Sequence, residues 1–125
     1  MAYKEKELIF KLGELFCGPG GLGLAAKQAE IENKDFHIVH AWANDYDLDT
    51  CNTYENNIPN KKGSVVCEDI RKLDYSVLKS ISEIDALAFG FPCNDFSVVG
   101  EQKGINGSFG PLYTYGVKAL KYFKP

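Results

Sequence analysis

The stretch FKLGELFCGPGGLG, residues 10–23, decides the fold. Its first half predicts a strand over Phe10–Phe16, and the four glycines of the second half predict a tight turn over Cys17–Gly23. A helix is expected from Leu22 to about Ile31, where leucines and alanines allow close packing. A strand that runs through a glycine-rich turn into a helix is typical of the first unit of a parallel α/β sheet.

The rest of the chain alternates in the same way between strand-like and helix-like segments. Further strands are predicted at His37–Asn44, Ser64–Cys67 and Ile84–Phe89. Further helices are predicted from a cap at Asp47 or Asp49 to about Asn56, over Tyr75–Ile81, and from Leu112, just after Pro111, to about Phe123. This alternation predicts an α/β domain with about four parallel strands and flanking helices.

The composition is that of one globular domain. The chain has 125 residues, of which 45% are hydrophobic, and a net charge of −3, a balance that excludes intrinsic disorder. No apolar run approaches the ~20 residues that span a bilayer, and the polar start is not a secretory signal. We therefore expect a cytoplasmic protein with no membrane partner. A free-standing nucleic-acid binder usually carries a basic surplus, so any grip on nucleic acid must come from a local patch or from further protein.

The cysteines and histidines do not form a metal-binding pattern. None of the four cysteines is paired as Cys-x-x-Cys. His37 and His40 lie three residues apart in a predicted strand, so their side chains should point to opposite faces. We therefore expect no metal, and we interpret Cys51 and Cys67 as free structural thiols.

The glycine turn also predicts a ligand. Gly18, Gly20 and Gly23 form a G-x-G-x-x-G pattern between a strand and a helix, and Asp45 follows Gly23 by 22 residues. Such glycines let the backbone approach a nucleoside cofactor, and the acid bonds the ribose hydroxyls. NAD and S-adenosylmethionine both fit this pattern.

Residues after the second and third strands lie at the same edge of the predicted sheet, where α/β folds bind ligands. Tyr46 is either a cover for an adenine ring or a half-exposed tyrosine at a strand end. Asp69 either bonds the adenine amino group, with Ile70 against the ring, or is a helix cap or a solvated loop acid.

The sharpest chemical signal is GFPCNDFS, residues 90–97, directly after the fourth strand. It places the Cys93 thiol on the ligand-binding edge, in a turn whose direction glycine and proline fix. The loop continues to Gly110 and is rich in glycine, and loops this long in compact domains are usually functional. These surroundings favour a nucleophile over an inert, packed cysteine.

Five segments, taken in order, resemble the DNA (cytosine-5) methyltransferases, and the resemblance extends from about Leu12 to the end. They are ELFCGPGG (14–21), NDY (44–46), DI (69–70), GFPCNDFS (90–97) and VGEQKG (99–104). Glu14 stands where the family more usually has aspartate, and Asn94 where it more usually has glutamine. The resemblance implies a Rossmann-like S-adenosylmethionine-dependent methyltransferase fold, incomplete in this chain, and DNA methylation of the restriction-modification kind.

The resemblance also implies a mechanism and a set of site residues. The Cys93 thiolate would add to C6 of a cytosine flipped out of double-stranded DNA, and C5 would then take the methyl group. Asp45 would bind the ribose, Asp69 the adenine amino group, and Ser97 would lie toward a DNA phosphate. The remaining residues implied for the cofactor site are Phe16, Gly18, Gly20, Gly21, Tyr46, Ile70, Pro92 and Leu112.

The family has later segments that this sequence does not contain. They include a Glu-Asn-Val motif, an arginine-bearing motif, a target-recognition domain and a C-terminal motif that completes the cofactor site. We therefore expect residues 1–125 to be the N-terminal part of the catalytic domain, a fragment or split subunit that is inactive without a complementary C-terminal chain. The alternatives are a non-catalytic cofactor- or partner-binding module and an NAD-dependent oxidoreductase, which the glycine pattern and Asp45 also allow.

Overall fold

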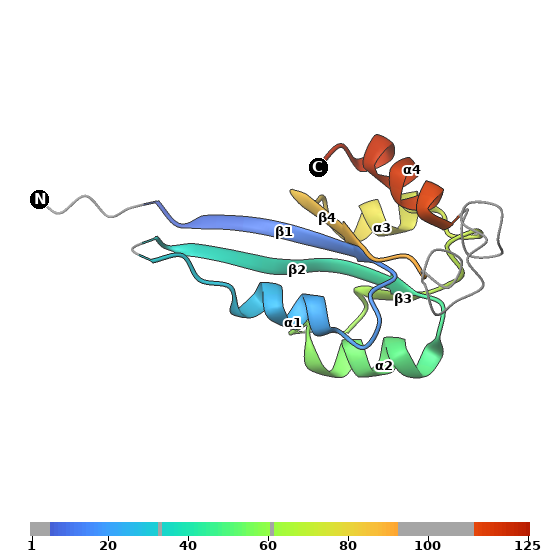
Figure 1. Ribbon diagram of the computed structural model, residues 1–125, viewed down its shortest axis with the longest axis horizontal. Coiled ribbons are helices and arrows are strands. Elements are labelled where there is room, and N and C mark those ends of the chain that lie inside the picture. Colours follow the sequence, from blue (N-terminus) through green and yellow to red (C-terminus); the bar gives the residue numbers. More distant parts are fainter. Residues whose placement is uncertain (1–5, 33, 61, 93–111) are drawn as a thin grey trace, which may run out of the picture.

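The computed structural model describes residues 6–32, 34–60, 62–92 and 112–125, and it contains one parallel sheet (Figure 1). The strands are β1 (Leu8–Leu15), β2 (Phe36–Asp45), β3 (Val65–Cys67) and β4 (Ala86–Phe89), in the spatial order β3-β2-β1-β4. Every neighbouring pair is parallel. The predicted α/β fold with four parallel strands is therefore confirmed.

Two helices cover each face of the sheet. They are α1 (Gly21–Gln28) and α2 (Leu48–Asn57) on one face, and α3 (Tyr75–Ile81) and α4 (Tyr113–Phe123) on the other (Figure 1). Because all four strands run in the same direction, their carboxyl ends meet along one edge of the sheet. The turn before α1 and the segments that follow β2, β3 and β4 all begin at this edge.

The helix and strand boundaries follow the sequence closely. Helix α3 has the predicted bounds, and Asp47 is the residue that caps α2, where its carboxylate accepts a hydrogen bond from the Thr50 amide at 2.9 Å. The main difference is at the end of α1, which was predicted to reach about Ile31. It stops at Gln28 because Ala29 is already extended. The predicted start of the last helix at Leu112 is its N-cap residue, and Pro111 lies outside the described residues.

The core consists of two apolar clusters, one under each helical layer. The larger cluster lies under α3 and α4 and is centred on Trp42, whose exposed fraction is 0%; its other buried members are Leu15, Ala41, Ile70, Leu78, Ile84, Ala119 and Phe123. The smaller cluster lies under α2 and contains Cys17, Ala43, Tyr54 and Ile58. Burial of these side chains fixes the strands that carry the site. Within the described ranges, no helix is long and apolar enough to cross a membrane.

Candidate functional site

A cavity of about 450 Å³ opens at the carboxyl edge of the sheet. It is lined by Phe16, Asn44, Asp45, Tyr46, Glu68, Asp69, Ile70, Arg71, Pro92 and Leu112. Residues from the end of β2 and from the segments that follow β1, β3 and β4 therefore meet at one place, as the parallel topology requires. Seven of these ten residues were predicted from the sequence as site residues; Asn44, Glu68 and Arg71 were not.

The Asp45 carboxylate joins the end of β2 to the glycine turn. Its Oδ2 atom accepts a hydrogen bond from the Gly18 amide at 3.0 Å, and its Oδ1 atom accepts from the amides of Tyr46 at 2.8 Å and Asp47 at 3.2 Å. The carboxylate therefore holds the turn in place, in addition to the ligand role that was predicted for it. These three donors use three of the about four acceptor positions of the carboxylate, which leaves one for a ligand.

The predicted glycines lie beside the cavity without lining it. Gly18 and Gly20 have φ angles of +58° and +114°, values that L side chains rarely adopt, so the turn depends on glycine at both positions. Gly21 is the first residue of α1. Phe16 also has a positive φ, of 53°, which is unusual for a bulky residue and directs the chain out of β1 at the wall of the cavity.

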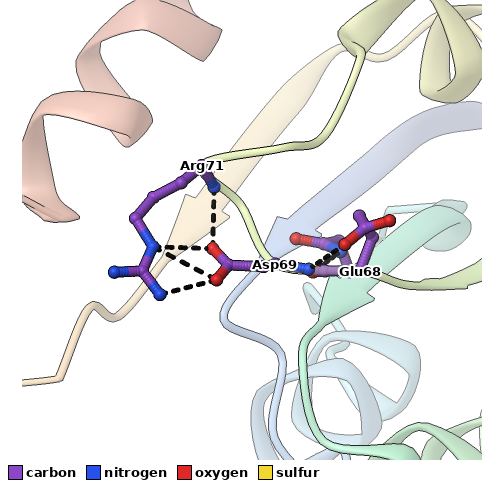
Figure 2. Close-up of polar contacts among 4 residues, drawn as sticks. Glu68, Asp69 and Arg71 are labelled. Atoms are coloured by element: carbon purple, nitrogen blue, oxygen red, sulfur yellow. Dashed lines mark hydrogen bonds and ion pairs between the residues drawn. The ribbon is translucent and has the colours of Figure 1, made fainter.

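Asp69 is held by a neighbour that sequence reasoning did not consider. The guanidinium of Arg71 donates to both carboxylate oxygens of Asp69, and the Arg71 amide donates to Oδ1 at 2.9 Å (Figure 2). These hydrogen bonds lower the pKa of Asp69 to about 2. Asp69 is therefore not a helix cap, because Asp74 caps α3. Its place in the sequence, two residues before an arginine in a turn, was the signal that could have revealed the pair.

Asn44 holds the segment that leaves β3 in place beside the cavity. Its buried side-chain amide donates to the carbonyl oxygens of Val66 at 2.8 Å and Glu68 at 2.9 Å. The two bonds fix the chain that leaves β3 against the end of β2, and so they position the segment that carries Asp69. The polar residue at the buried end of a strand was the available sequence signal.

A buried polar network lies behind the glycine turn. The Tyr54 hydroxyl donates to the Glu14 carboxylate, and it also contacts Nδ1 of His40 at 3.2 Å; Nε2 of His40 lies 2.8 Å from the Ser64 hydroxyl. Burial raises the pKa of Glu14 and that of Tyr54, and it lowers the pKa of His40 to about 4. Gly23 packs against this network, since a Cβ there would lie 2.7 Å from the Tyr54 hydroxyl.

The lowered pKa of His40 predicts a pH-dependent stability. As the pH falls, the ring takes up a proton in the unfolded chain, near 6.5, before it does so in the folded chain, near 4. The contribution of neutral His40 is therefore present above about 6.5 and is lost toward pH 4. Urea unfolding should show that the wild type loses up to about 2 kcal/mol more stability than His40→Gln between pH 7 and pH 5. The raised pKa of Glu14 makes its contribution to stability change with pH in the opposite direction, but Glu14 is present in both the wild type and His40→Gln and so cancels in the comparison. If the two proteins lost stability in parallel as the pH fell, the assignment of the pH dependence to His40 would be contradicted.

The two buried cysteines are not activated. Cys17 and Cys51 are buried, Cys67 is exposed, and all three are free thiols. Burial raises the pKa of Cys17 and of Cys51, with the nearby Asp45 adding to both shifts. A buried thiol with a raised pKa is a poor nucleophile. Cys93 and Ser97, the predicted nucleophile and the predicted DNA-contacting residue, lie outside the described residues.

The two histidines have different hydrogen-bond partners. His40 contacts Tyr54 and Ser64, whereas His37 contacts Asp35 at 2.9 Å. The potential ligand atoms of Glu7, Asp35 and His37 lie within 4.8 Å of one another, but all three residues are exposed, and exposed acidic groups of this kind are common without an ion.

The fold and the cavity together define a class of protein. Carboxylates at the ends of adjacent parallel strands, beside a glycine-rich strand–helix turn and apolar walls, are the arrangement typical of nucleoside-binding α/β domains. Comparison with known proteins identifies the family. Residues 10–125 match the C-5 cytosine-specific DNA methylase family, and the chain belongs to that family.

The relatives of the chain are longer than the chain itself. It is 53% identical over 122 residues to the Type II methyltransferase M.BbvI of Brevibacillus brevis, covering 93% of this chain and 33% of that protein. It is 33% identical over 118 residues to the Type II methyltransferase M.Bsp6I of Bacillus sp. (strain RFL6), covering 94% and 34%. It is 31% identical over 128 residues to the DNA (cytosine-5-)-methyltransferase M.ApeKI of Aeropyrum pernix, covering 89% and 26%. The chain thus spans about a third or less of the length of these relatives.

Proposed function

We propose that this chain is the cofactor-binding and nucleophile-bearing part of a DNA (cytosine-5) methyltransferase. The observation that carries the proposal is that seven residues expected to bind S-adenosylmethionine line one cavity, in a chain of the C-5 cytosine-specific DNA methylase family. The opposing interpretation, an NAD-dependent oxidoreductase, rests only on the glycine pattern and Asp45 and does not account for the family match.

The residues around the cavity suit an S-adenosyl group. Asp45 retains an acceptor position for a ribose hydroxyl, and Asp69 offers a carboxylate to the adenine amino group. Tyr46 and Ile70 would flank the adenine ring, with Phe16, Pro92 and Leu112 as further apolar walls. Gly18, Gly20 and Gly21 would let the turn approach the ligand. When bound, S-adenosylmethionine supplies the methyl group.

Cys93 would perform the covalent step on the base. Its thiolate adds to C6 of a flipped cytosine, which forms a sulfur–carbon bond and moves electron density to C5. C5 would take the methyl group as its bond to the donor sulfur breaks, which would leave S-adenosylhomocysteine. C5 would then give up its proton to a base, and the electron pair that returns to the ring would expel the thiolate from C6.

The partners follow from the same proposal. The substrate would be double-stranded DNA that contains the target cytosine, with Ser97 toward a phosphate. The net charge of −3 gives this chain no overall attraction to DNA. A complementary C-terminal chain, which would correspond to the remaining two thirds of the enzyme, would therefore supply most of the DNA-binding contacts. We expect the chain alone to be inactive.

Calorimetry of the chain with S-adenosylmethionine and with NADH tests the cofactor assignment. We expect weak binding of S-adenosylmethionine at millimolar concentration and none of NADH. Tyr46→Ala should weaken binding by about 2- to 13-fold, because an aromatic contact contributes about 0.5–1.5 kcal/mol. The fold should survive because Tyr46 is 75% exposed. Leu48→Ala, at another exposed residue outside the cavity, is the control. Binding of NADH in preference to S-adenosylmethionine would refute the proposal.

A further inference from the structure

Arg71 is the one basic residue among the described residues that line the cavity, and its side chain forms an ion pair with Asp69 there. Its Nε atom lies 3.0 and 3.1 Å from the two carboxylate oxygens of Asp69, and its Nη2 atom lies 2.6 Å from Oδ2. Figure 2 shows the guanidinium facing the carboxylate, with the backbone amide of Arg71 bound to the same group. Two side-chain donors and one backbone donor therefore fix the orientation of the carboxylate.

The same contacts leave the carboxylate able to bind one more donor. The four hydrogen bonds from Arg71 use only three N–H groups, because the Nε–H group is shared between both carboxylate oxygens. A carboxylate accepts from about four donors, so one acceptor position on Asp69 remains. The carboxylate of the neighbouring Glu68 accepts from the Asp69 amide at 2.8 Å. One oriented acceptor position on a lining residue of the cavity is what an exocyclic amino group needs.

Stability of the fold does not account for this pair. The Arg71 side chain is 62% exposed, and the two residues are only two positions apart in the chain. Exposed ion pairs of this kind contribute little to folding. Because the Arg71–Asp69 pair contributes little to folding and lies on the wall of the cavity, we look for its role in ligand binding.

We propose that Arg71 is a positioning residue that orients the Asp69 carboxylate for the base of the cofactor, and that it thereby favours a base with an exocyclic amino group over one with a carbonyl group. The inference rests on the proposed binding of an S-adenosyl group in this cavity. A fixed carboxylate accepts from an amino group and repels a carbonyl oxygen, whereas a carboxylate that rotates freely loses part of this preference.

Ligand-observed NMR with the chain tests the inference, because it measures weak binding. The ligands are S-adenosylhomocysteine and its deaminated analogue, in which hypoxanthine replaces adenine. We expect the wild type to prefer the adenine compound, and Arg71→Ala to reduce that preference at least about 5-fold, without a change in the thermal unfolding midpoint. Arg71→Lys keeps the charge but not the planar fork, so it should not restore the preference.

Lys72→Ala is the matched control, because Lys72 is the adjacent cation and does not line the cavity; it should keep the wild-type preference. An equal loss of affinity for both ligands in Arg71→Ala, or no change in either, would overturn the role of Arg71 while leaving the cofactor assignment intact. Failure of the wild type to bind S-adenosylhomocysteine at all would overturn both, and so distinguishes the two proposals.

Discussion

Replacing Cys93 by serine should abolish methyl transfer, with a loss of at least about a thousand-fold, on the order seen when a catalytic nucleophile is removed. A thiol with a pKa near 8.5 yields some thiolate at neutral pH, whereas a serine hydroxyl yields almost no alkoxide and is a far weaker nucleophile toward C6. The assay needs a complete enzyme. We suggest a chimera in which this chain replaces the matching third of the Brevibacillus brevis relative, with transfer of a radiolabelled methyl group to DNA as the measurement.

Cys67→Ser in the same chimera is the matched control. Cys67 is an exposed free thiol that does not line the cavity, so this variant should retain activity close to that of the unmodified chimera. Substantial activity of Cys93→Ser would remove the covalent step from the proposed mechanism. Full activity of the unmodified 125-residue chain on its own would show that the expected need for a C-terminal chain is wrong.

The fold was predictable because local signals and topology agree. The strand–turn–helix pattern at residues 10–23 begins a parallel sheet, and a helix between successive strands returns the chain so that the next strand can join in the same direction. Helix α3 followed from local sequence alone, whereas the sequence left the cap of α2 open between Asp47 and Asp49 and the structure selects Asp47. The end of α1 was placed three residues too late, because alanine-rich sequence favours a helix and Ala29 shows no local reason to leave it.

The site was predictable as a set of positions, but not as a set of contacts. Parallel strands bring Asp45, Asp69 and Pro92 to one edge, so sequence order was enough to group them. The hydrogen-bond partners of each side chain depend on the geometry of the turns at this edge. Turns have no regular sequence pattern from which that geometry could be read. The hydrogen bond from Gly18 to Asp45 and the hydrogen-bonded ion pair between Arg71 and Asp69 were therefore found only in the structure.

Gly13→Ala should destabilise the fold by about 3 kcal/mol, the upper part of the usual range for overpacking a core. Gly13 pairs directly with Trp42 across β1 and β2, and the indole ring lies over the glycine. A Cβ at Gly13 would lie 2.5, 2.7 and 2.8 Å from three ring carbons of Trp42. The ring cannot easily give way, because it is fully buried and packs against Phe123 with ring centroids 5.0 Å apart.

The sign of the stability change in Gly13→Ala shows whether the clash with Trp42 or the loss of backbone entropy on replacing glycine dominates. On entropy alone, alanine in a strand should be more stable than glycine by roughly 0.5–1 kcal/mol. Gly90→Ala is the control for that contribution, since a Cβ at Gly90 would meet no atom of the described residues within 4 Å and its φ is not positive; it should change stability by less than about 1 kcal/mol. Urea unfolding followed by the fluorescence of the single tryptophan measures both variants. If Gly13→Ala were as stable as the wild type, Trp42 could not lie across β1 as the structure has it, and the core that holds the carboxyl edge of the sheet would be packed differently.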